Sequence, residues 1–174
     1  MAVDTHRIDI MNALKRSEVF LGLEDKYLER IASLPSSCEK TLKYGETLFQ
    51  FGERAELLYV LKEGRIDLVA GFAPESEPGK PKLVVDKVTV GGFLGWSALV
   101  APYYYVLSAI AEVHSTVVCI RGSELIALSD EDFYVGYRIF SGLSRIIGSR
   151  LREYEQVLAR GRRWPFLNGD VKVP

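Results

Sequence analysis

The spacing of hydrophobic and polar positions changes twice along this chain of 174 residues. Hydrophobic residues recur at helical spacing within residues 8–34, where Gly22 separates two segments and Pro35 follows the second. From residue 38 to residue 120 they alternate with polar residues, and helical spacing returns after Gly122. The pattern predicts two short N-terminal helices, a β domain and C-terminal helices.

The central region predicts several short strands separated by glycine turns, in the segments 38–44, 46–51, 56–72, 82–90 and 111–120. Two alternating runs joined across Lys62–Gly64 predict a β-hairpin. Residues 73–82 hold three prolines and one glycine, which predicts a mobile hairpin loop. No helices alternate with these strands, so a parallel α/β fold is disfavoured. We expect a mainly β fold, a jelly roll or a barrel.

After Gly122 the sequence predicts a long helix. Ser129 and Asp132 have the spacing of a capping box at its start. One apolar stripe follows, formed by Ile139, Leu143, Ile146, Ile147, Leu151, Tyr154 and Leu158. A helix of about 30 residues measures ~45 Å, more than a small barrel can cover, so we expect its far end to pack on a second copy of the chain.

Three glycines at positions 136, 142 and 148 interrupt the predicted helix, each at a cost of ~1 kcal/mol relative to alanine. Close approach of another backbone explains them, and so does a local bend. The sequence leaves both explanations open.

Composition narrows the class of protein. Hydrophobic residues make up 48% and charged residues 26%, and the net charge is −1, so no global field favours nucleic acid or an anionic membrane. No apolar run approaches the ~20 residues of a membrane-spanning helix, and the N-terminus has no apolar signal core. We expect a cytoplasmic protein with no membrane partner. Cys38 and Cys119 lack metal-ligand spacing, and we interpret them as reduced, buried thiols.

Residues 44–69, YGETLFQFGERAELLYVLKEGRIDLV, resemble the first half of a cyclic-nucleotide-binding domain, as in catabolite activator protein and the regulatory subunit of protein kinase A. Glycines, an acidic residue and an aromatic residue occur in the order that this family has: Gly45, Glu46, Gly52, Tyr59 and Gly64. The resemblance covers about residues 14–158. It implies a double-wound β-roll, or jelly roll, flanked by short N-terminal helices and a long C-terminal helix that packs against a dimer mate.

The second half resembles the phosphate-binding cassette of the family, which reads Gly-x-x-Phe-Gly-Glu-(Leu/Ile)-Ala-Leu and, further on, Pro-Arg-x-Ala-Thr. Here GGFLGWSAL places Gly91, Leu94, Gly95, Trp96, Ser97, Ala98 and Leu99 in register, and YYVLSAIA lies at the arginine stretch. The resemblance therefore assigns ligand binding to Gly95, Trp96, Ser97, Ala98, Leu99, Tyr104, Tyr105 and Ser108.

The resemblance also shows what this cassette lacks. In the family, backbone N–H groups at a short helix, a bidentate arginine and a glutamate that accepts the ribose hydroxyl hold the nucleotide. Trp96 takes the glutamate position, and an indole cannot accept a hydrogen bond. Direct counting places the arginine at Tyr105, whereas a bacterial subgroup that reads Gly-Trp-Ser and Pro-Pro-Tyr-Arg-Tyr places it at Tyr104.

Losing the arginine clamp removes roughly 2–4 kcal/mol, or tens- to hundreds-fold in affinity. We therefore expect no cofactor and no tight binding of cyclic AMP or cyclic GMP. Tyr103, Tyr104 and Tyr105 either stack on a neutral ligand or fill the vacated pocket, and Trp96 either stacks on a base or packs. A replacement cation has three candidates, Lys80, Lys82 and Lys87.

No enzyme motif is found: the chain has no His-x-His cluster, no Gly-x-Ser-x-Gly, no P-loop and no Cys-x-x-Cys. Two cysteines are too few for an iron–sulfur sensor, and His6 and His114 cannot form a metal site by themselves. Only 14 residues follow Arg160, too few for a helix-turn-helix, so we expect no nucleic-acid partner.

The sequence thus predicts an N-terminal helical segment (1–36), a β-roll (37–122), C-terminal helices (123–160) and a tail (161–174). We expect the C-terminal helices to dimerise through residues 131–160, and Trp164 and Phe166 to anchor the tail. Two functions fit. One is a regulatory sensor, with an unknown small-molecule ligand, a protein partner and no DNA-binding domain of its own. The other is a dimeric interaction scaffold that no ligand controls.

Overall fold

The computed structural model describes residues 2–70 and 84–159. Helical segments come first: α1 (Ala2–Lys15), η1 (Glu18–Phe20) and α2 (Asp25–Ala32). The strands are β1 (Cys38–Leu42), β2 (Thr47–Phe49), β3 (Leu57–Glu63), β4 (Ile66–Val69), β5 (Val84–Val88), β6 (Phe93–Leu94), β7 (Ser108–Ala111) and β8 (Ser115–Arg121). A short 3-10 helix, η2 (Trp96–Leu99), precedes β7, and the chain continues into α3 (Gly122–Glu131) and α4 (Phe133–Ala159).

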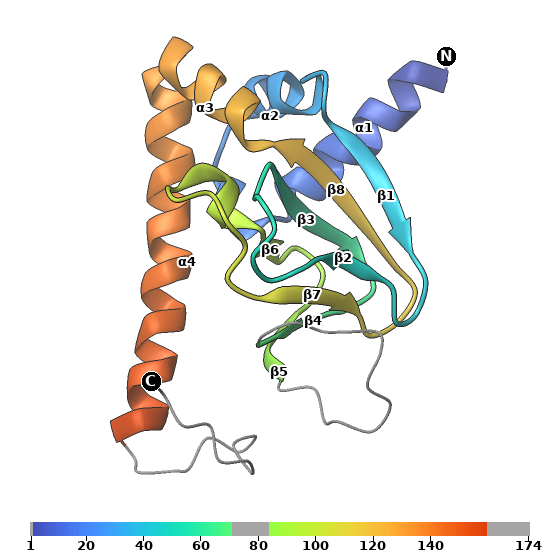
Figure 1. Cartoon of the computed structure of the whole chain (residues 1–174). Coiled ribbons are helices and arrows are strands. Elements are labelled where there is room, and N and C mark those ends of the chain that lie inside the picture. The colour runs from blue at the N-terminus through green and yellow to red at the C-terminus, as the bar shows by residue number, and fades with distance from the viewer. Residues whose placement is uncertain (1, 71–83, 160–174) are drawn as a thin grey trace.

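The strands form two four-stranded antiparallel sheets, in the orders β1-β8-β3-β6 and β2-β7-β4-β5. The short helices gather at one end of the sheets and α4 runs along one side (Figure 1). This is the double-wound β-roll, and the predicted fold class is confirmed. Purely antiparallel pairing also agrees with the exclusion of a parallel α/β fold.

The hairpin predicted across Lys62–Gly64 is wrong. β3 pairs with β6 and β8, whereas β4 pairs with β5 and β7 in the other sheet. The two runs are halves of one strand that bends at Gly64, and β7 and β8 are the halves of its antiparallel partner. Consecutive residues are buried in both halves, so the hydrophobic pattern of the two runs does not show which strands pair, and the glycine between them fits a hairpin equally well.

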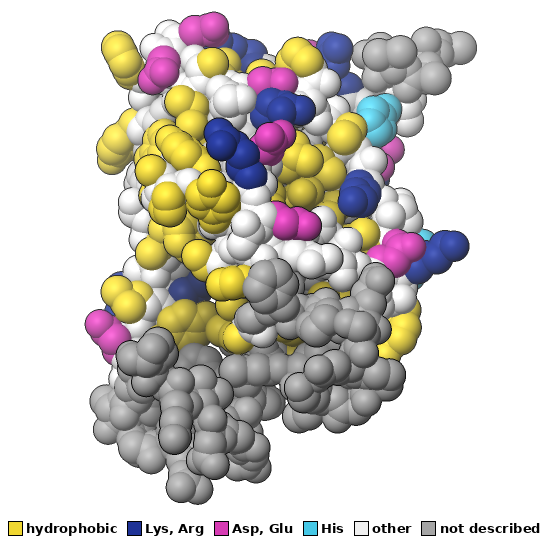
Figure 2. Space-filling model, viewed as in Figure 1, with side chains coloured by type: hydrophobic (Ala, Val, Ile, Leu, Met, Phe, Trp, Pro, Cys, Tyr) yellow, Lys and Arg dark blue, Asp and Glu magenta, His cyan; other side chains and the backbone are white. Residues whose placement is uncertain are grey.

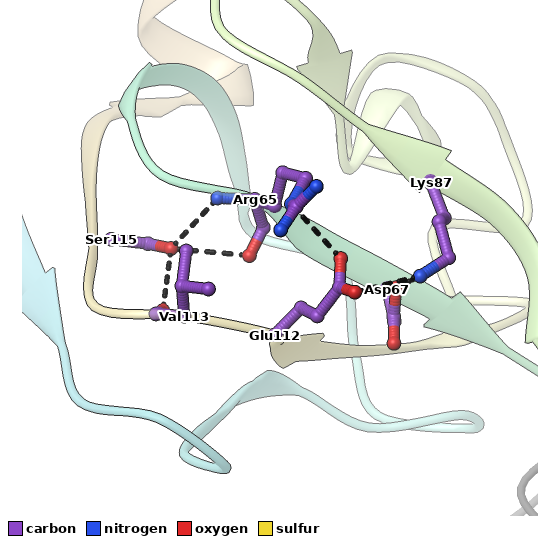
Figure 3. A network of polar contacts seen from close by, with 6 residues as sticks. All are labelled: Arg65, Asp67, Lys87, Glu112, Val113 and Ser115. Carbon is purple, nitrogen blue, oxygen red and sulfur yellow. Dashed lines mark hydrogen bonds and ion pairs between the residues drawn. The ribbon is translucent and has the colours of Figure 1, made fainter.

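Ser115 holds the corner where the strand passes between the sheets. Its Oγ accepts a hydrogen bond from the Arg65 amide (3.1 Å) and donates to the Val113 carbonyl oxygen (2.8 Å) (Figure 3). Beside the corner, Arg65 Nε lies 3.2 Å from Glu112 Oε2, and Lys87 Nζ lies 2.8 Å from Glu112 Oε1. These charges occupy the exposed edge of the corner and do not enter the roll.

The hydrophobic core fills the space between the sheets and continues under α1 and α4. Phe20 of η1 and Phe93 of β6 are almost fully buried and meet edge to face, with ring centroids 6.4 Å apart. Burial of such a side chain stabilises the fold by about 1.5–3 kcal/mol. η1 thereby joins the N-terminal segment to the roll.

The N-terminal helical segment differs from the prediction in its boundaries. α1 begins at Ala2 and ends at Lys15, and the stretch predicted to end the first helix forms the separate η1. The second predicted helix is present as α2. The apolar residues of η1 are buried in the core, and this packing, rather than their helical spacing relative to α1, determines where they lie.

The capping box predicted at Ser129 and Asp132 is wrong. Ser129 lies inside α3, and its hydroxyl donates to the Leu125 carbonyl oxygen (2.8 Å). Asp132 lies between the helices, and its Oδ1 accepts a hydrogen bond from the Val135 amide (3.3 Å), so Asp132 caps α4 by itself. Its other oxygen, Oδ2, accepts a hydrogen bond from Arg30 of α2 (2.9 Å).

The apolar stripe of α4 packs mainly on the chain's own body. Ile139, Leu143 and Ile146 are buried, with exposed fractions of 1%, 3% and 6%, whereas Leu151 is exposed. Only the far part of the stripe is therefore open to a second copy.

Two glycines of α4 permit close contacts within the chain. A Cβ on Gly142 would collide with the carbonyl oxygen of Val19, and one on Gly136 would lie 3.0 Å from that of Ser129. Near Gly148 the closest atom is Arg152 Nη1 at 3.5 Å. Close backbone approach thus explains Gly136 and Gly142, and the approaching backbone belongs to the same chain.

Cys38 and Cys119 are both free thiols, and the prediction that both are buried is wrong for Cys38, which is exposed on the edge strand β1. The two cysteines are paired opposite each other across β1 and β8. The predicted loop at 73–82, the tail at 161–174 and the candidates Lys80 and Lys82 lie outside the described residues.

Candidate functional site

A cavity of about 360 Å³ lies between the roll and α4. Its volume falls within the range of small-molecule sites, roughly 300–1,000 Å³. Both sheets and the segment before β7 contribute apolar walls, formed by Phe49, Leu68, Val85, Leu94, Val106 and Leu107. The remaining walls come from the cassette and from α4.

The cassette wall consists of Gly95, Trp96 and Ser97. Gly95 has φ +75°, and a Cβ there would lie 2.9 Å from the Leu57 carbonyl oxygen, so the turn into η2 requires glycine. Ala98 and Leu99 are buried in the same short helix but do not line the cavity. The turn thus places Trp96 and Ser97 at the cavity, while the next two side chains support them.

Tyr105 also lines the cavity. It is only 5% exposed, its ring stacks on Phe49 with centroids 3.9 Å apart, and its hydroxyl donates a hydrogen bond to the Leu57 carbonyl oxygen (2.6 Å). Burial raises the pKa of Tyr105, so the phenol is neutral at physiological pH. Tyr59, behind Phe49, has its pKa raised by burial as well. No charge stands at this position.

Tyr104 and Ser108 do not reach the cavity. Tyr104 is 48% exposed, and its backbone forms an isolated bridge with Arg54. Ser108 is fully buried, and its Oγ accepts a hydrogen bond from the Phe51 amide (3.0 Å). Of the two registers that the sequence left open for the family arginine, the one at Tyr105 faces the cavity.

The α4 wall was not assigned to the site from the sequence. It consists of Ile147, Arg150, Leu151 and Tyr154, which share one face of the helix at i, i+3, i+4 and i+7. Three of them belong to the stripe that we attributed to dimerisation. An arginine within that stripe is the signal that could have separated a cavity wall from a dimer contact.

Arg150 is the one charged side chain among the described residues that line the cavity. Its Nε lies 3.5 Å from Asp86 Oδ2, and its Nη2 donates a long hydrogen bond of 3.4 Å to the Phe93 carbonyl oxygen. Asp86 largely balances this charge, so the cavity as a whole is apolar and close to neutral.

Lys87, which the sequence offered as a replacement cation, is not a cavity residue. It extends away toward Glu112 and Asp67 at the sheet corner (Figure 3). The hydrogen bond to Glu112 raises the pKa of Lys87 above 10.5.

The lining of the cavity shows what the site can hold. It suits a mainly apolar molecule, with polar contacts available from Ser97 and Arg150.

The sequence model of the cyclic nucleotide-binding domain family matches residues 39–132, more than half of the chain. The chain belongs to the cyclic nucleotide-binding domain family. No curated protein matches it. Domains of this family are regulatory rather than enzymatic.

Solved structures agree with this membership. A candidate cyclic nucleotide-binding protein from Geobacter metallireducens GS-15 is 28% identical, with a TM-score of 0.66 over 80% of this chain and 96% of that one. A cyclic nucleotide-binding domain from Methylobacillus flagellatus KT is 16% identical, with a TM-score of 0.71 over 90% of this chain and 85% of that one.

A third structure is the regulatory subunit of a cAMP-independent protein kinase A from Trypanosoma brucei. It is 16% identical, with a TM-score of 0.69 over 90% of this chain and 53% of that one. Within the part of this chain that the structure describes, no helix is long and apolar enough to cross a bilayer, and no cluster of three or more His, Cys, Asp or Glu side chains could hold a metal ion.

Proposed function

We propose that this member of the cyclic nucleotide-binding domain family is a regulatory sensor whose site has changed from a charged nucleotide pocket to an apolar one. The observation that carries the proposal is the position of Tyr105: a neutral, buried phenol stands where the resemblance places the arginine, at the wall of an apolar cavity. A small and mainly apolar organic molecule is the ligand class that fits this cavity.

Tight binding of cyclic AMP or cyclic GMP does not fit this site. The Tyr105 hydroxyl already donates to Leu57, and Trp96 cannot accept a hydrogen bond from a ribose hydroxyl. A cyclic phosphate would lose its hydration, and Arg150, the one cation among the described residues that line the cavity, already pairs with Asp86, so burying the phosphate costs several kcal/mol. The T. brucei regulatory subunit, described as cAMP-independent, is a precedent for this fold serving regulation without cAMP.

Signal transmission would pass through α4. The cavity is lined on one side by four residues of α4, Ile147, Arg150, Leu151 and Tyr154. The contacts that a bound ligand makes therefore depend on where α4 lies. A ligand can shift an equilibrium only through such differential contacts. We propose that α4 is the output element and that a protein partner reads its position.

The α4 region also presents a surface for a second copy. Phe133, Tyr134, Tyr137 and Phe140 are exposed, with fractions of 84%, 43%, 69% and 39%. Figure 2 shows hydrophobic side chains gathered along this side of the molecule. Exposed aromatic side chains are typical of interface cores. We propose that the homodimer forms through residues 131–160, with this aromatic face as its centre.

The same division of roles follows the segments predicted from the sequence. Residues 37–122 supply the roll and cassette walls of the site, and residues 123–160 supply its α4 wall, transmit the signal and dimerise. Residues 1–36 pack on the roll through η1, and residues 161–174 have no assigned role. Because the net charge is −1, no overall positive charge attracts nucleic acid or an anionic membrane, and we propose neither as a partner.

A dimeric scaffold without ligand control is the second candidate. The observation that favours it is the internal satisfaction of Tyr105, which stacks on Phe49 and donates to Leu57 without any ligand. In that case the tyrosine fills the roll, and the aromatic face of α4 alone carries the function.

A thermal-shift titration separates the two. Cyclic AMP, cyclic GMP, decanoate and decanol would be titrated against the purified chain. A sensor is stabilised by decanoate or decanol, by about 4 kcal/mol at a thousand times the dissociation constant, and not by the nucleotides. Stabilisation by decanoate alone assigns an acidic ligand held by Arg150, and stabilisation by both assigns a neutral one. No shift with any probe selects the scaffold.

Two variants show whether a shift arises at this cavity. Leu151→Trp fills the cavity from α4 and should abolish the shift. Ser144→Trp is the matched control, because Ser144 is exposed on the same helix and does not line the cavity. If both variants respond like the wild type, the probe binds elsewhere and the sensor proposal fails.

A further inference from the structure

Cys38 and Cys119, far apart in the sequence, face each other across the edge of one sheet. Cys38 begins the edge strand β1, and its partner in the antiparallel register with β8 is Cys119. β1 pairs with β8 alone among the described strands.

This register is compatible with a disulfide bond. Residues directly opposite each other in an antiparallel pair have Cα atoms about 4.5–5.5 Å apart. A disulfide bond spans Cα separations of about 4.4–6.8 Å, so the register brings the two backbones within the range that a disulfide bond requires. Side chains of opposite residues also point to the same face of the sheet.

The two thiols differ in accessibility. Cys38 is exposed, whereas Cys119 is 4% exposed and lies opposite Tyr59, inside the roll. Burial, with a smaller contribution from Cys38, raises the pKa of Cys119 to about 12. An external oxidant therefore meets Cys38 first, and Cys119 is shielded from everything except Cys38.

We propose that Cys38 and Cys119 form a reversible intrachain disulfide bond by exchange with a small disulfide, such as oxidised glutathione. The Cys38 thiolate attacks one sulfur of the small disulfide, forms a mixed disulfide and releases one small thiol. The sulfur of Cys119 then attacks the Cys38 sulfur, its proton passes to the leaving thiolate, and a second small thiol departs. Two protein thiols are oxidised, and one small disulfide is reduced to two thiols.

The bond would join the edge strand to the centre of its sheet. Cys119 lies between Cys38 on β1 and Tyr59 on β3, so one row of residues connects β1 to the aromatic stack of Tyr59 and Phe49. Unpaired edges are where sheets open or add strands. Oxidation would thus hold the edge strand β1 covalently on β8, next to the layer that supports the cavity.

The test is chemical and uses the full chain. Folded protein is incubated with oxidised glutathione, its remaining free thiols are alkylated in denaturant, and the intact mass is measured. The proposal predicts a product with neither alkyl groups nor glutathione, which dithiothreitol converts back to two alkylatable thiols. Two free thiols, a persistent glutathione adduct on the wild type, or chains cross-linked to each other would each overturn it.

Variants assign the two steps. Cys119→Ala should accumulate glutathione on Cys38, and Cys38→Ser should leave Cys119 unmodified while the protein is folded. A chain carrying Cys38→Ser with Lys40→Cys is the matched control: its exposed thiol lies on the same strand opposite Val117 and should take up glutathione without closing a disulfide. Closure in this control to the wild-type extent would contradict the role of register.

Discussion

The hydroxyl of Tyr105 donates a hydrogen bond of 2.6 Å to the carbonyl oxygen of Leu57. Tyr105 stands at the position where the family resemblance places an arginine. Its ring lies flat on Phe49, so the whole side chain is held by the roll itself. The position to which the resemblance assigns the arginine thus belongs to the hydrophobic core in this chain, and the consequences can be measured in stability as well as in binding.

Tyr105→Phe removes this hydrogen bond and leaves the Leu57 carbonyl oxygen without the phenol. Loss of a partner from a buried polar group costs about 1–3 kcal/mol, so we expect a fall of that size in the free energy of unfolding. Urea denaturation measures it. Tyr104→Phe is the matched control, because that side chain is 48% exposed, and we expect a change within about 0.5 kcal/mol. Equal effects of the two substitutions would contradict the role given to Tyr105.

The glycines of α4 predict opposite effects for the same substitution. Gly142→Ala should destabilise the fold, because its Cβ collides with the Val19 carbonyl oxygen and would push η1 from the core. Gly148→Ala, where no atom lies closer than 3.5 Å, should stabilise the helix by about 1 kcal/mol. Thermal unfolding of the two variants checks this, and destabilisation by both would show that Gly148 is also packed.

The charged corner at Glu112 predicts a pH dependence of stability. The hydrogen bond from Lys87 lowers the pKa of Glu112 below 4.5, with help from Arg65. A carboxyl whose pKa is lower in the folded state stabilises the protein above its unfolded pKa, and the stabilisation is lost as the pH falls through the folded value. Glu112→Gln should therefore lower the urea midpoint at pH 7 more than at pH 3. A difference that does not change with pH would mean that the ion pairs contribute nothing.

The aromatic face of α4 predicts an oligomeric state. If Phe133, Tyr137 and Phe140 form the centre of a homodimer, Tyr137→Glu should place two like charges in that interface and yield a monomer. Light scattering after size-exclusion chromatography measures the mass. Arg145→Glu is a control on an exposed position of the same helix outside this face and should remain dimeric. A monomeric wild type would remove the dimer from the proposal.

Short strands and glycine turns predicted a jelly roll or a barrel, and the resemblance to the family implied the double-wound β-roll that the structure has. The strand pairing of β3 and β4 could not be predicted, because a hydrophobic pattern indicates that a strand is buried and not which strand lies beside it. In the sequence Gly64 is typical of a hairpin turn, whereas in the structure the chain passes from one sheet to the other at Gly64.

The cassette wall of Gly95, Trp96 and Ser97 and the cavity residue Tyr105 could be predicted because the family resemblance aligns these positions with its cassette and its arginine. The α4 wall was missed because an apolar stripe looks the same whether it covers the chain's own cavity or a partner. The contact between Cys38 and Cys119 was missed because the register of β1 with β8 depends on a strand pairing distant in the sequence.

Substitution of Trp96 and Tyr105 tests whether these two residues are what prevents tight binding of cyclic AMP. Isothermal titration with cyclic AMP would compare the wild type with the double variant Trp96→Glu, Tyr105→Arg, which restores the acceptor and the cation. We predict no binding at micromolar affinity for the wild type and a gain of tens- to hundreds-fold for the double variant. Tyr104→Arg, with its side chain in solvent, should gain nothing. A wild type that binds cyclic AMP at micromolar affinity or tighter would contradict the loss of the charged site.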